Sequence, residues 1–181
     1  MTQIKAVLFD LDGTVNDTVT DLAVSVNYAL NKNGLPTHPV DAYKLFAGNG
    51  MRVMVQRAMP EGQKEGDLFE QVVADYAEYY ALHSMDNTKP YDDVPELIDK
   101  IREMGYKTAV VTNKPDVQAK PLIEQMLPGK FDVVIGQMVK AGYLSKEQGE
   151  ELKNSEMVLD FHSADHKAGL ATYFREYLRS V

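Results

Sequence analysis

Short runs of apolar residues predict three strands of a parallel sheet. The runs cover residues 4–9, 109–111 and 129–137, and the last of them opens with a turn. The first run is apolar almost without interruption from Ala6, which is typical of a strand covered on both faces. Parallel strands need helical crossovers between them, so the pattern predicts an α/β fold.

Apolar residues between the first two strands recur instead at the spacing of helices. In the segment 17–33, Leu22, Val26, Ala29 and Leu30 fall on one helical face. Similar patterns predict further helices over 39–46, 51–59 and 67–83, the last with an apolar stripe of Leu68, Phe69, Val72, Tyr76 and Tyr80 that we interpret as core.

This helical segment is too long for an ordinary connection, so residues 15–87 are predicted to form an all-helical domain of their own. The α/β domain then comprises residues 1–14 and 88–181. Pro95 suits the first turn of a helix, whose expected apolar face is Leu97, Ile98, Ile101 and Met104. A further helix is expected over 116–127, with Pro121 shifting its start or kinking it.

The amino-acid composition argues against several classes of protein function. The chain has 181 residues, 44% of them hydrophobic, which suffices for one substantial core or a core with a small accessory domain. A net charge of −8 without a basic patch argues against a nucleic-acid binder. The absence of cysteine excludes disulfides, cysteine-zinc sites and thiol catalysis. We find no apolar run of membrane-spanning length and no signal peptide, and expect a cytoplasmic protein.

Two carboxylates follow the first predicted strand. Asp10 and Asp12 lie one residue apart and repel each other, so a cation is expected beside them. Hard oxygen ligands point to Mg²⁺, which binds one or two carboxylates together with phosphate oxygens. Gly13 permits a sharp turn whose amides can face an anion. The alternative is an ordinary acidic turn before a helix capped by Asp17 or Thr18.

The stretch from Asp10 to Val15, Asp-Leu-Asp-Gly-Thr-Val, resembles the first motif of the haloacid dehalogenase (HAD) superfamily of phosphohydrolases. The resemblance implies that Asp10 is a nucleophile and Asp12 a general acid/base. It also implies that Mg²⁺ binds the Asp10 carboxylate and the Asp12 backbone carbonyl, with the loop amides at Gly13 and Thr14 binding phosphate. The dehalogenases themselves lack the second Asp, so Asp12 favours phosphate chemistry.

Two later stretches extend the resemblance. The helical domain resembles the cap of phosphoglycolate phosphatases and β-phosphoglucomutases, and its loop at 48–52 resembles the one that faces the substrate. Arg52 is then a candidate for a substrate carboxylate, or else a solvated residue at a helix start. Thr112 and Asn113, followed by Lys114, resemble the second motif, which implies phosphate binding by Thr112 and Asn113. Alone, Thr112 reads equally well as a helix cap.

The resemblance weakens after Gln137. The family pattern calls for a Lys-Pro pair whose lysine neutralises the nucleophile and phosphate, then for a strand ending in Gly-Asp with a second Asp. The lysines after Gln137 include Lys140, Lys146 and Lys153, none with the expected neighbours. Residues 145–155 instead predict a helix that opens with a capping box.

Asp160 and Asp165 have a spacing that one form of the last motif uses, so both are candidate Mg²⁺ ligands. Asp165 is equally suited to cap a final helix. His162 and His166 are interpreted as satisfied or solvated residues rather than as metal ligands. The segment 170–181 predicts an amphipathic helix that packs on the sheet or forms a partner surface.

These observations predict an α/β, HAD-like Rossmannoid core of parallel strands with an inserted all-helical cap. The predicted function is Mg²⁺-dependent hydrolysis of a small phosphomonoester, similar to phosphoglycolate, through an aspartyl-phosphate. The alternatives are a phosphosugar mutase of the same superfamily, or a HAD-like binding protein with little activity. The expected partner is a small phosphorylated metabolite, with no nucleic acid or membrane, for a monomer or homodimer.

Overall fold

The computed structural model describes residues 6–136, which divide into two compact units. The core unit contains residues 6–14 and 92–136, and the cap is the unit Val15–Tyr91. The sequence prediction put the second boundary after residue 87. The structure puts it after Tyr91, because residues 89–90 pair with residues 16–17 inside the cap. The helices predicted over 145–155 and 170–181 lie outside the described residues.

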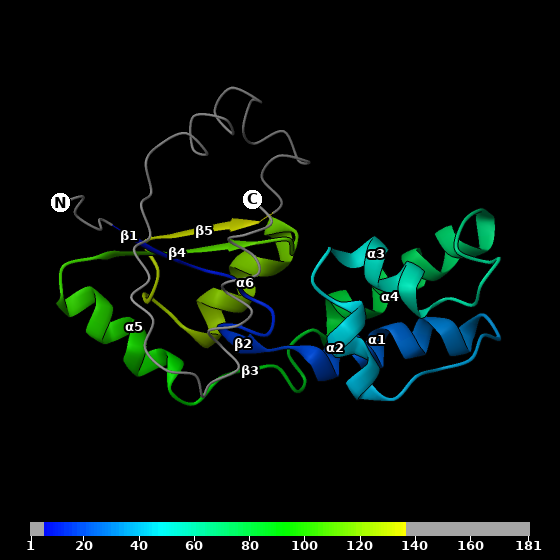
Figure 1. Cartoon of the computed structure of the whole chain (residues 1–181), viewed down its shortest axis with the longest axis horizontal. Coiled ribbons are helices and arrows are strands. Elements are labelled where there is room, and N and C mark those ends of the chain that lie inside the picture. The colour runs from blue at the N-terminus through cyan, green and yellow to red at the C-terminus, as the bar shows by residue number, and fades with distance from the viewer. Residues whose placement is uncertain (1–5, 137–181) are drawn as a thin grey trace, which may run out of the picture. The chain divides into compact units, whose positions relative to one another are not determined.

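Three parallel strands form the sheet of the core unit: β1 (Ala6–Phe9), β4 (Lys107–Thr112) and β5 (Val133–Gly136). Their order is β1-β4-β5 (Figure 1). Phe9 lies opposite Val110, and Thr112 lies opposite Gly136. All strands therefore end at one edge of the sheet, called the carboxyl edge from here on. The α/β class and the three predicted strands are confirmed.

Helices α5 (Val94–Glu103) and α6 (Asp116–Met126) connect these strands. Figure 1 shows both on the same face of the sheet, as two right-handed crossovers in one direction require. The predicted apolar face of α5 is partly wrong. Val94 and Ile98 are buried, whereas Leu97 and Met104 are exposed. Helix α6 starts where it was predicted, so Pro121 inside it does not shift its start.

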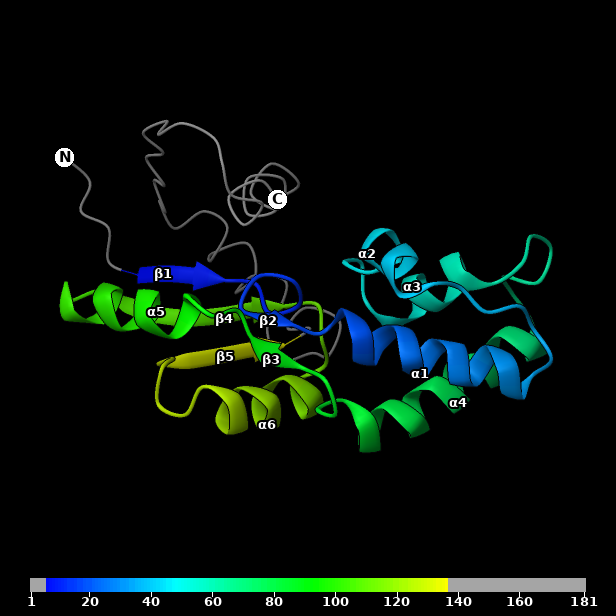
Figure 2. The same ribbon diagram turned by 90° about the horizontal axis from the view of Figure 1, so that it is seen from below.

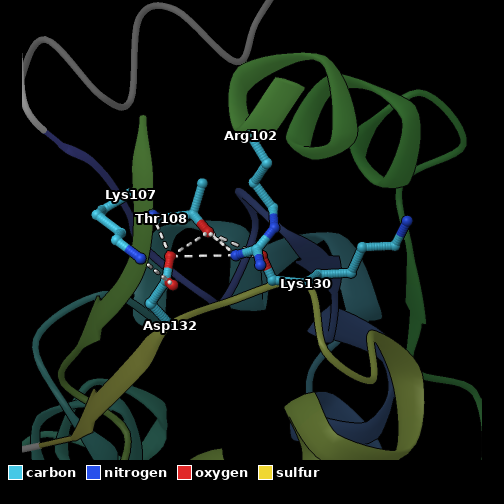
Figure 3. Close-up of polar contacts among 5 residues, drawn as sticks. All are labelled: Arg102, Lys107, Thr108, Lys130 and Asp132. Atoms are coloured by element: carbon cyan, nitrogen blue, oxygen red, sulfur yellow. Dashed lines mark hydrogen bonds and ion pairs between the residues drawn. The ribbon is translucent and has the colours of Figure 1, made fainter. Parts of the chain in front are cut away.

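The amino end of the sheet is held by Asp132, which directly precedes β5 (Figure 3). Its Oδ2 accepts hydrogen bonds from the Thr108 backbone N–H at 2.9 Å and from Arg102 Nη1 at 3.1 Å. Its Oδ1 lies 3.2 Å from Lys107 Nζ. The Thr108 N–H and the two cations hold the pKa of the Asp132 carboxyl below its usual range. The start of β5 is thus fixed beside β4, at the end of the sheet opposite the carboxyl edge.

The cap consists mainly of helices, as predicted. They are α1 (Val19–Lys32), the 3-10 helix η1 (Val40–Ala42), α2 (Tyr43–Phe46), α3 (Met51–Ala58) and α4 (Asp67–His83). Helices α1 and α4 lie side by side in both views (Figures 1 and 2). The prediction of an all-helical insert missed an antiparallel pair of two-residue strands, β2 (Asn16–Asp17) and β3 (Lys89–Pro90). Among the described helices, none is both long and apolar enough to cross a membrane.

The cap has its own hydrophobic core. The predicted faces of α1 and α4 are buried in it, except that Leu68 is exposed. Its fully buried members include Val26, Ala29, Leu30, Tyr43, Val55, Val72 and Tyr80. Every residue of this cluster belongs to the cap, which indicates a unit that packs around its own centre.

Asp21 ties together the two places where the chain enters and leaves the cap. This carboxylate is 2% exposed and lies in the first turn of α1. It accepts hydrogen bonds from the backbone N–H of Asn87 at 3.0 Å and of Thr88 at 2.8 Å. The side chains of both residues donate to it as well. These four donors, all from Asn87 and Thr88, satisfy the buried carboxylate. They hold the start of α1 beside the residues that lead into β3.

Candidate active site

Asp10 and Thr112 meet at the carboxyl edge of the sheet. Asp10 directly follows β1, and Thr112 is the last residue of the neighbouring strand β4. The Thr112 hydroxyl donates a hydrogen bond to the Asp10 carboxylate. The same hydroxyl oxygen accepts the Lys114 backbone N–H at 3.2 Å. Because its acceptor side is engaged by the loop, the hydroxyl proton is directed toward Asp10.

The pKa of the Asp10 carboxyl is raised to about 6. Burial is the largest cause, and the negative charge of Asp12 raises the pKa further. Hydrogen bonds from the Leu11 backbone and Thr112, together with the Lys114 charge, act in the opposite direction. At pH 7 such a carboxyl is about ten times more often ionised than protonated. Asp10 is therefore an anionic group with little hydration, which is the form that a nucleophile needs.

Gly13 turns the chain back after the two aspartates. Its φ of +78° lies in the left-handed region, which a residue with a side chain adopts at a cost. The Thr14 N–H donates to the Leu11 carbonyl at 3.3 Å and closes this turn. Leu11 and Thr14 are buried while Gly13 is exposed, so the turn is anchored on both sides of its tip.

Lys114 also belongs to this site, although sequence reasoning gave it no role. Its side chain is 3% exposed, and its Nζ lies 3.0 Å from Asp12 Oδ1. That oxygen accepts no hydrogen bond of good geometry within the described part of the chain, so charge attraction holds the contact. The sequence did contain a pattern that could have pointed to Lys114. Lys114 and Pro115 form a Lys-Pro pair, which the sequence analysis looked for only after Gln137.

The loop that carries Lys114 is clamped between β4 and β5. The Gly136 backbone N–H donates to Asp116 Oδ1 at 2.8 Å. A Cβ on Gly136 would lie 2.5 Å from the Lys114 carbonyl oxygen and 2.7 Å from the Asp116 nitrogen. A glycine at the end of β5 is thus required by close backbone approach, and this approach fixes the position of the loop.

Other predicted site residues lie elsewhere. Asn113 is exposed on the loop after Thr112. Arg52 lies in the cap, where its Nη1 donates to Glu70 Oε2 at 2.9 Å and its Nη2 to Glu70 Oε1 at 2.5 Å. Its guanidinium also stacks over the Phe69 ring. A substrate carboxylate would have to replace Glu70, and the role of Arg52 stays a prediction.

The candidate ligands Asp160 and Asp165, with His162 and His166, lie outside the described residues. Residues 6–136 contain no cluster of three or more histidine or acidic side chains that could hold a metal.

Comparison with known proteins identifies the family behind this arrangement. Residues 7–142 match the Haloacid dehalogenase-like hydrolase family, three quarters of the chain. The chain belongs to this family. The resemblance to this family that was inferred from the motifs is confirmed.

The most similar relatives include the phosphoglycolate phosphatase of Pseudomonas putida, which is 37% identical over 131 residues, covering 70% of this chain and 48% of that protein. The phosphoglycolate phosphatase of Haemophilus influenzae is 36% identical over 128 residues, covering 67% and 57%. A solved structure of a predicted phosphoglycolate phosphatase from Haemophilus somnus has a TM-score of 0.70 and 32% identity, covering 77% and 65%. The chain thus spans only about half of the length of the curated relatives it matches.

Proposed function

We propose that this protein is a Mg²⁺-dependent phosphatase that hydrolyses a small phosphomonoester through an aspartyl-phosphate on Asp10. The observation that carries the proposal is the Asp10 carboxylate itself. It is partly buried, held by the Thr112 hydroxyl, and flanked by Asp12 on the same turn. The relatives named phosphoglycolate phosphatase support a phosphoglycolate-like substrate.

In the proposed reaction an Asp10 oxygen attacks phosphorus while Asp12 donates a proton to the leaving alcohol oxygen. Water then attacks the phosphorus of the aspartyl-phosphate while Asp12 takes the proton from that water; the bond between phosphorus and the Asp10 oxygen breaks, which releases inorganic phosphate and restores the Asp10 carboxylate. Asp12 fits this role because its side chain is 24% exposed, so solvent and a leaving group can reach it. The proposal assigns phosphoryl-oxygen binding to the Gly13 N–H and to the Thr112 hydroxyl, which would exchange its hydrogen bond to Asp10 for one to the phosphoryl oxygen. The Thr14 N–H, which was predicted to bind phosphate, donates instead to the Leu11 carbonyl.

The described residues fit Mg²⁺ by their donor chemistry. The Asp10 carboxylate and the Asp12 backbone carbonyl would supply hard oxygen ligands at one strand end, and the negative charge of Asp12 adds to burial in raising the pKa of the Asp10 carboxyl. One or two carboxylates with substrate phosphate and water are the usual Mg²⁺ set. When bound, Mg²⁺ supplies positive charge to the phosphoryl oxygens as phosphorus is attacked.

Hydrolysis of phosphoglycolate and of p-nitrophenyl phosphate, with Mg²⁺ and with EDTA, tests the proposal. We expect turnover only with Mg²⁺. Asp10→Asn should lower it by at least about a thousandfold, because the nucleophile is lost. The matched control is Asp92→Asn, which removes an exposed carboxylate from the same unit and should leave turnover unchanged. Turnover that survives in folded Asp10→Asn protein would rule out the assigned nucleophile.

A further inference from the structure

Three aromatic rings stack along the line where helices α1 and α4 of the cap lie side by side (Figure 2). The Tyr28 ring of α1 stacks on Tyr79 of α4 with ring centroids 4.1 Å apart, and Tyr79 stacks on His83 at 4.1 Å. Tyr28 is 42% exposed and the His83 side chain is 39% exposed. These three rings, called the aromatic ladder from here on, therefore lie at the surface of the cap and outside its buried cluster.

Apolar side chains flank the aromatic ladder on both helices. Val24 lies one turn before Tyr28 on α1 and is 41% exposed. Leu82 lies beside His83 on α4 and is 78% exposed. The ladder, Val24 and Leu82 together form one surface, called the ladder face from here on. Single exposed apolar side chains are common, whereas a continuous surface of them is typical of an interaction site.

One end of the ladder face carries a positive charge. Lys32 lies four residues after Tyr28 on α1, and its side chain is 46% exposed. Its Nζ lies 2.8 Å from Asp75 Oδ1, and Asp75 lies four residues before Tyr79, so the two helices run antiparallel along the ladder. Asp75, and more weakly Glu78, raise the pKa of Lys32. Because the Asp75 side chain is only 4% exposed, the ammonium is the group of this pair that a partner can reach.

The other end of the ladder face carries a negative charge. His83 lies four residues after Tyr79, and its Nδ1 lies 2.8 Å from Asp86 Oδ2. The Asp86 side chain is 57% exposed. Lys32 and Asp86 thus lie beyond the stacked rings on opposite sides. A twofold axis brings each end of such a face against the other end of a second copy, so the opposite charges would meet.

We propose that the ladder face binds a second copy of this chain, so that the protein forms a homodimer joined through its caps. A twofold axis across the Tyr28–Tyr79 pair brings the aromatic rings of the two copies together. It also places Lys32 of each copy against the partner's Asp86. Tyrosine often dominates the binding energy of an interface, because its ring buries a large area. The face is complementary to itself in both charge and apolar character, which favours a second copy over an unrelated partner.

Sedimentation equilibrium of the full chain tests the proposal. At tens of micromolar, the wild-type protein should have twice the mass of one chain. Leu82→Glu puts a charge into the contact on both copies and should raise the dimer dissociation constant at least about tenfold. The matched control is Leu45→Glu on α2, at a leucine 80% exposed in the same unit, which should change it less than about twofold. Circular dichroism and thermal midpoints check that both variants fold.

Cysteine cross-linking tests how the two copies are arranged. The chain contains no cysteine, so introduced cysteines report proximity without background. Protein with Lys32→Cys, mixed with protein carrying Asp86→Cys, should form more disulfide-linked dimer than either protein alone, because opposite ends meet across the axis. In the control, Lys32→Cys mixed with Leu45→Cys should form little.

Three results would overturn the proposal. The first is a folded wild-type chain that stays monomeric at these concentrations. The second is a dimer that Leu82→Glu weakens no more than Leu45→Glu does, because another surface would then hold the copies together. The third is cross-linking of Lys32→Cys that is equal with Asp86→Cys and with Leu45→Cys. None of these measurements involves turnover, so their outcome is independent of the proposed phosphatase function.

Discussion

The Asp10 carboxylate is partly buried and lies near a second carboxylate, Asp12. Both features affect the charge of Asp10, and through it the stability and the proposed chemistry of the site. Its neighbours compensate the charge only in part, since the pKa remains at about 6 despite Thr112 and Lys114. The uncompensated charge costs stability in the free protein. In the proposed enzyme the same charge attracts Mg²⁺, and burial keeps the nucleophile poorly hydrated. The arrangement thus lowers the stability of the folded protein and raises the reactivity of Asp10.

Asp10→Asn should therefore stabilise the metal-free protein at neutral pH. The folded pKa is about 6 and the usual value 3.8, so the unfolded chain holds fewer protons than the native state between these values. Stability should fall as pH rises from about 4 to about 6 and stay lowered above that. With EDTA at pH 7.5, we expect the thermal midpoint of Asp10→Asn to exceed the wild-type value by about 3–6 °C, and the gap to close near pH 4.

Thermal melts across this pH range provide the check, with exposed Asp92→Asn as control. Added Mg²⁺ should raise the wild-type midpoint and leave Asp10→Asn nearly unchanged, because binding to the folded state stabilises it. A gap that grew toward pH 4 would contradict the sign of the pKa shift.

Strand β5 and the loop before α6 position each other at the scale of elements. Gly136 donates to Asp116 and approaches the Lys114 carbonyl so closely that no side chain fits between them. At the other end, Asp132 binds Thr108, Arg102 and Lys107 (Figure 3). Strand β5 is thus fixed to β4 at both ends. Its end at Gly136 also fixes the position of the loop that carries Lys114.

Gly136→Ala should disturb this loop. The added methyl group would lie 2.5 Å from the Lys114 carbonyl oxygen, so backbone has to move. We expect a loss of about 1–3 kcal/mol in the free energy of unfolding, measured by denaturant titration, with weaker phosphate binding. Val133→Ala, at a half-exposed position of the same strand, should cost less than about 1 kcal/mol and leave phosphate binding intact. Equal effects of the two substitutions would argue against the clamp.

The whole molecule consists of two units built on separate cores. The buried cluster of the cap draws on residues 22–80 alone. The cap ends are joined by the β2–β3 pair, by the Tyr91 N–H donating to the Val15 carbonyl at 3.1 Å, and by Asp21 with its four donors. An insert whose two ends are joined by its own hydrogen bonds can fold without the sheet that it interrupts.

We therefore propose that a fragment of residues 15–91 folds by itself. It should show helical circular dichroism and a cooperative thermal transition. Leu30→Ala, at a fully buried position, should cost about 2–5 kcal/mol, while Leu45→Ala, at a position 80% exposed, should change stability by less than about 0.5 kcal/mol. A fragment without a cooperative transition, or one equally sensitive to both substitutions, would show that the cap depends on the rest of the chain.

Local pattern in the sequence was enough for the strands, the helices and the aspartate motif. The apolar runs and the 3.6-residue spacing indicated the buried faces of α1 and α4, whereas Leu68 and part of the predicted face of α5 are exposed. Asp10, Asp12 and Thr112 became candidates because they follow or end apolar runs, since strand ends of a parallel sheet meet at one edge, and because their motifs resemble those of the family.

Contacts between distant residues were decided by tertiary structure. In the sequence, Lys114 cannot be distinguished from an ordinary loop lysine. In the structure, Gly136 of β5, 22 positions later, packs against the Lys114 backbone. The pairing of Arg52 with Glu70 depends on the position of α4, and the cap ends at Tyr91 because β3 pairs with β2. Whether a charged side chain is buried or paired depends on which segments pack around it. Those segments lie far apart in the sequence, so the pattern of neighbouring residues does not reveal them.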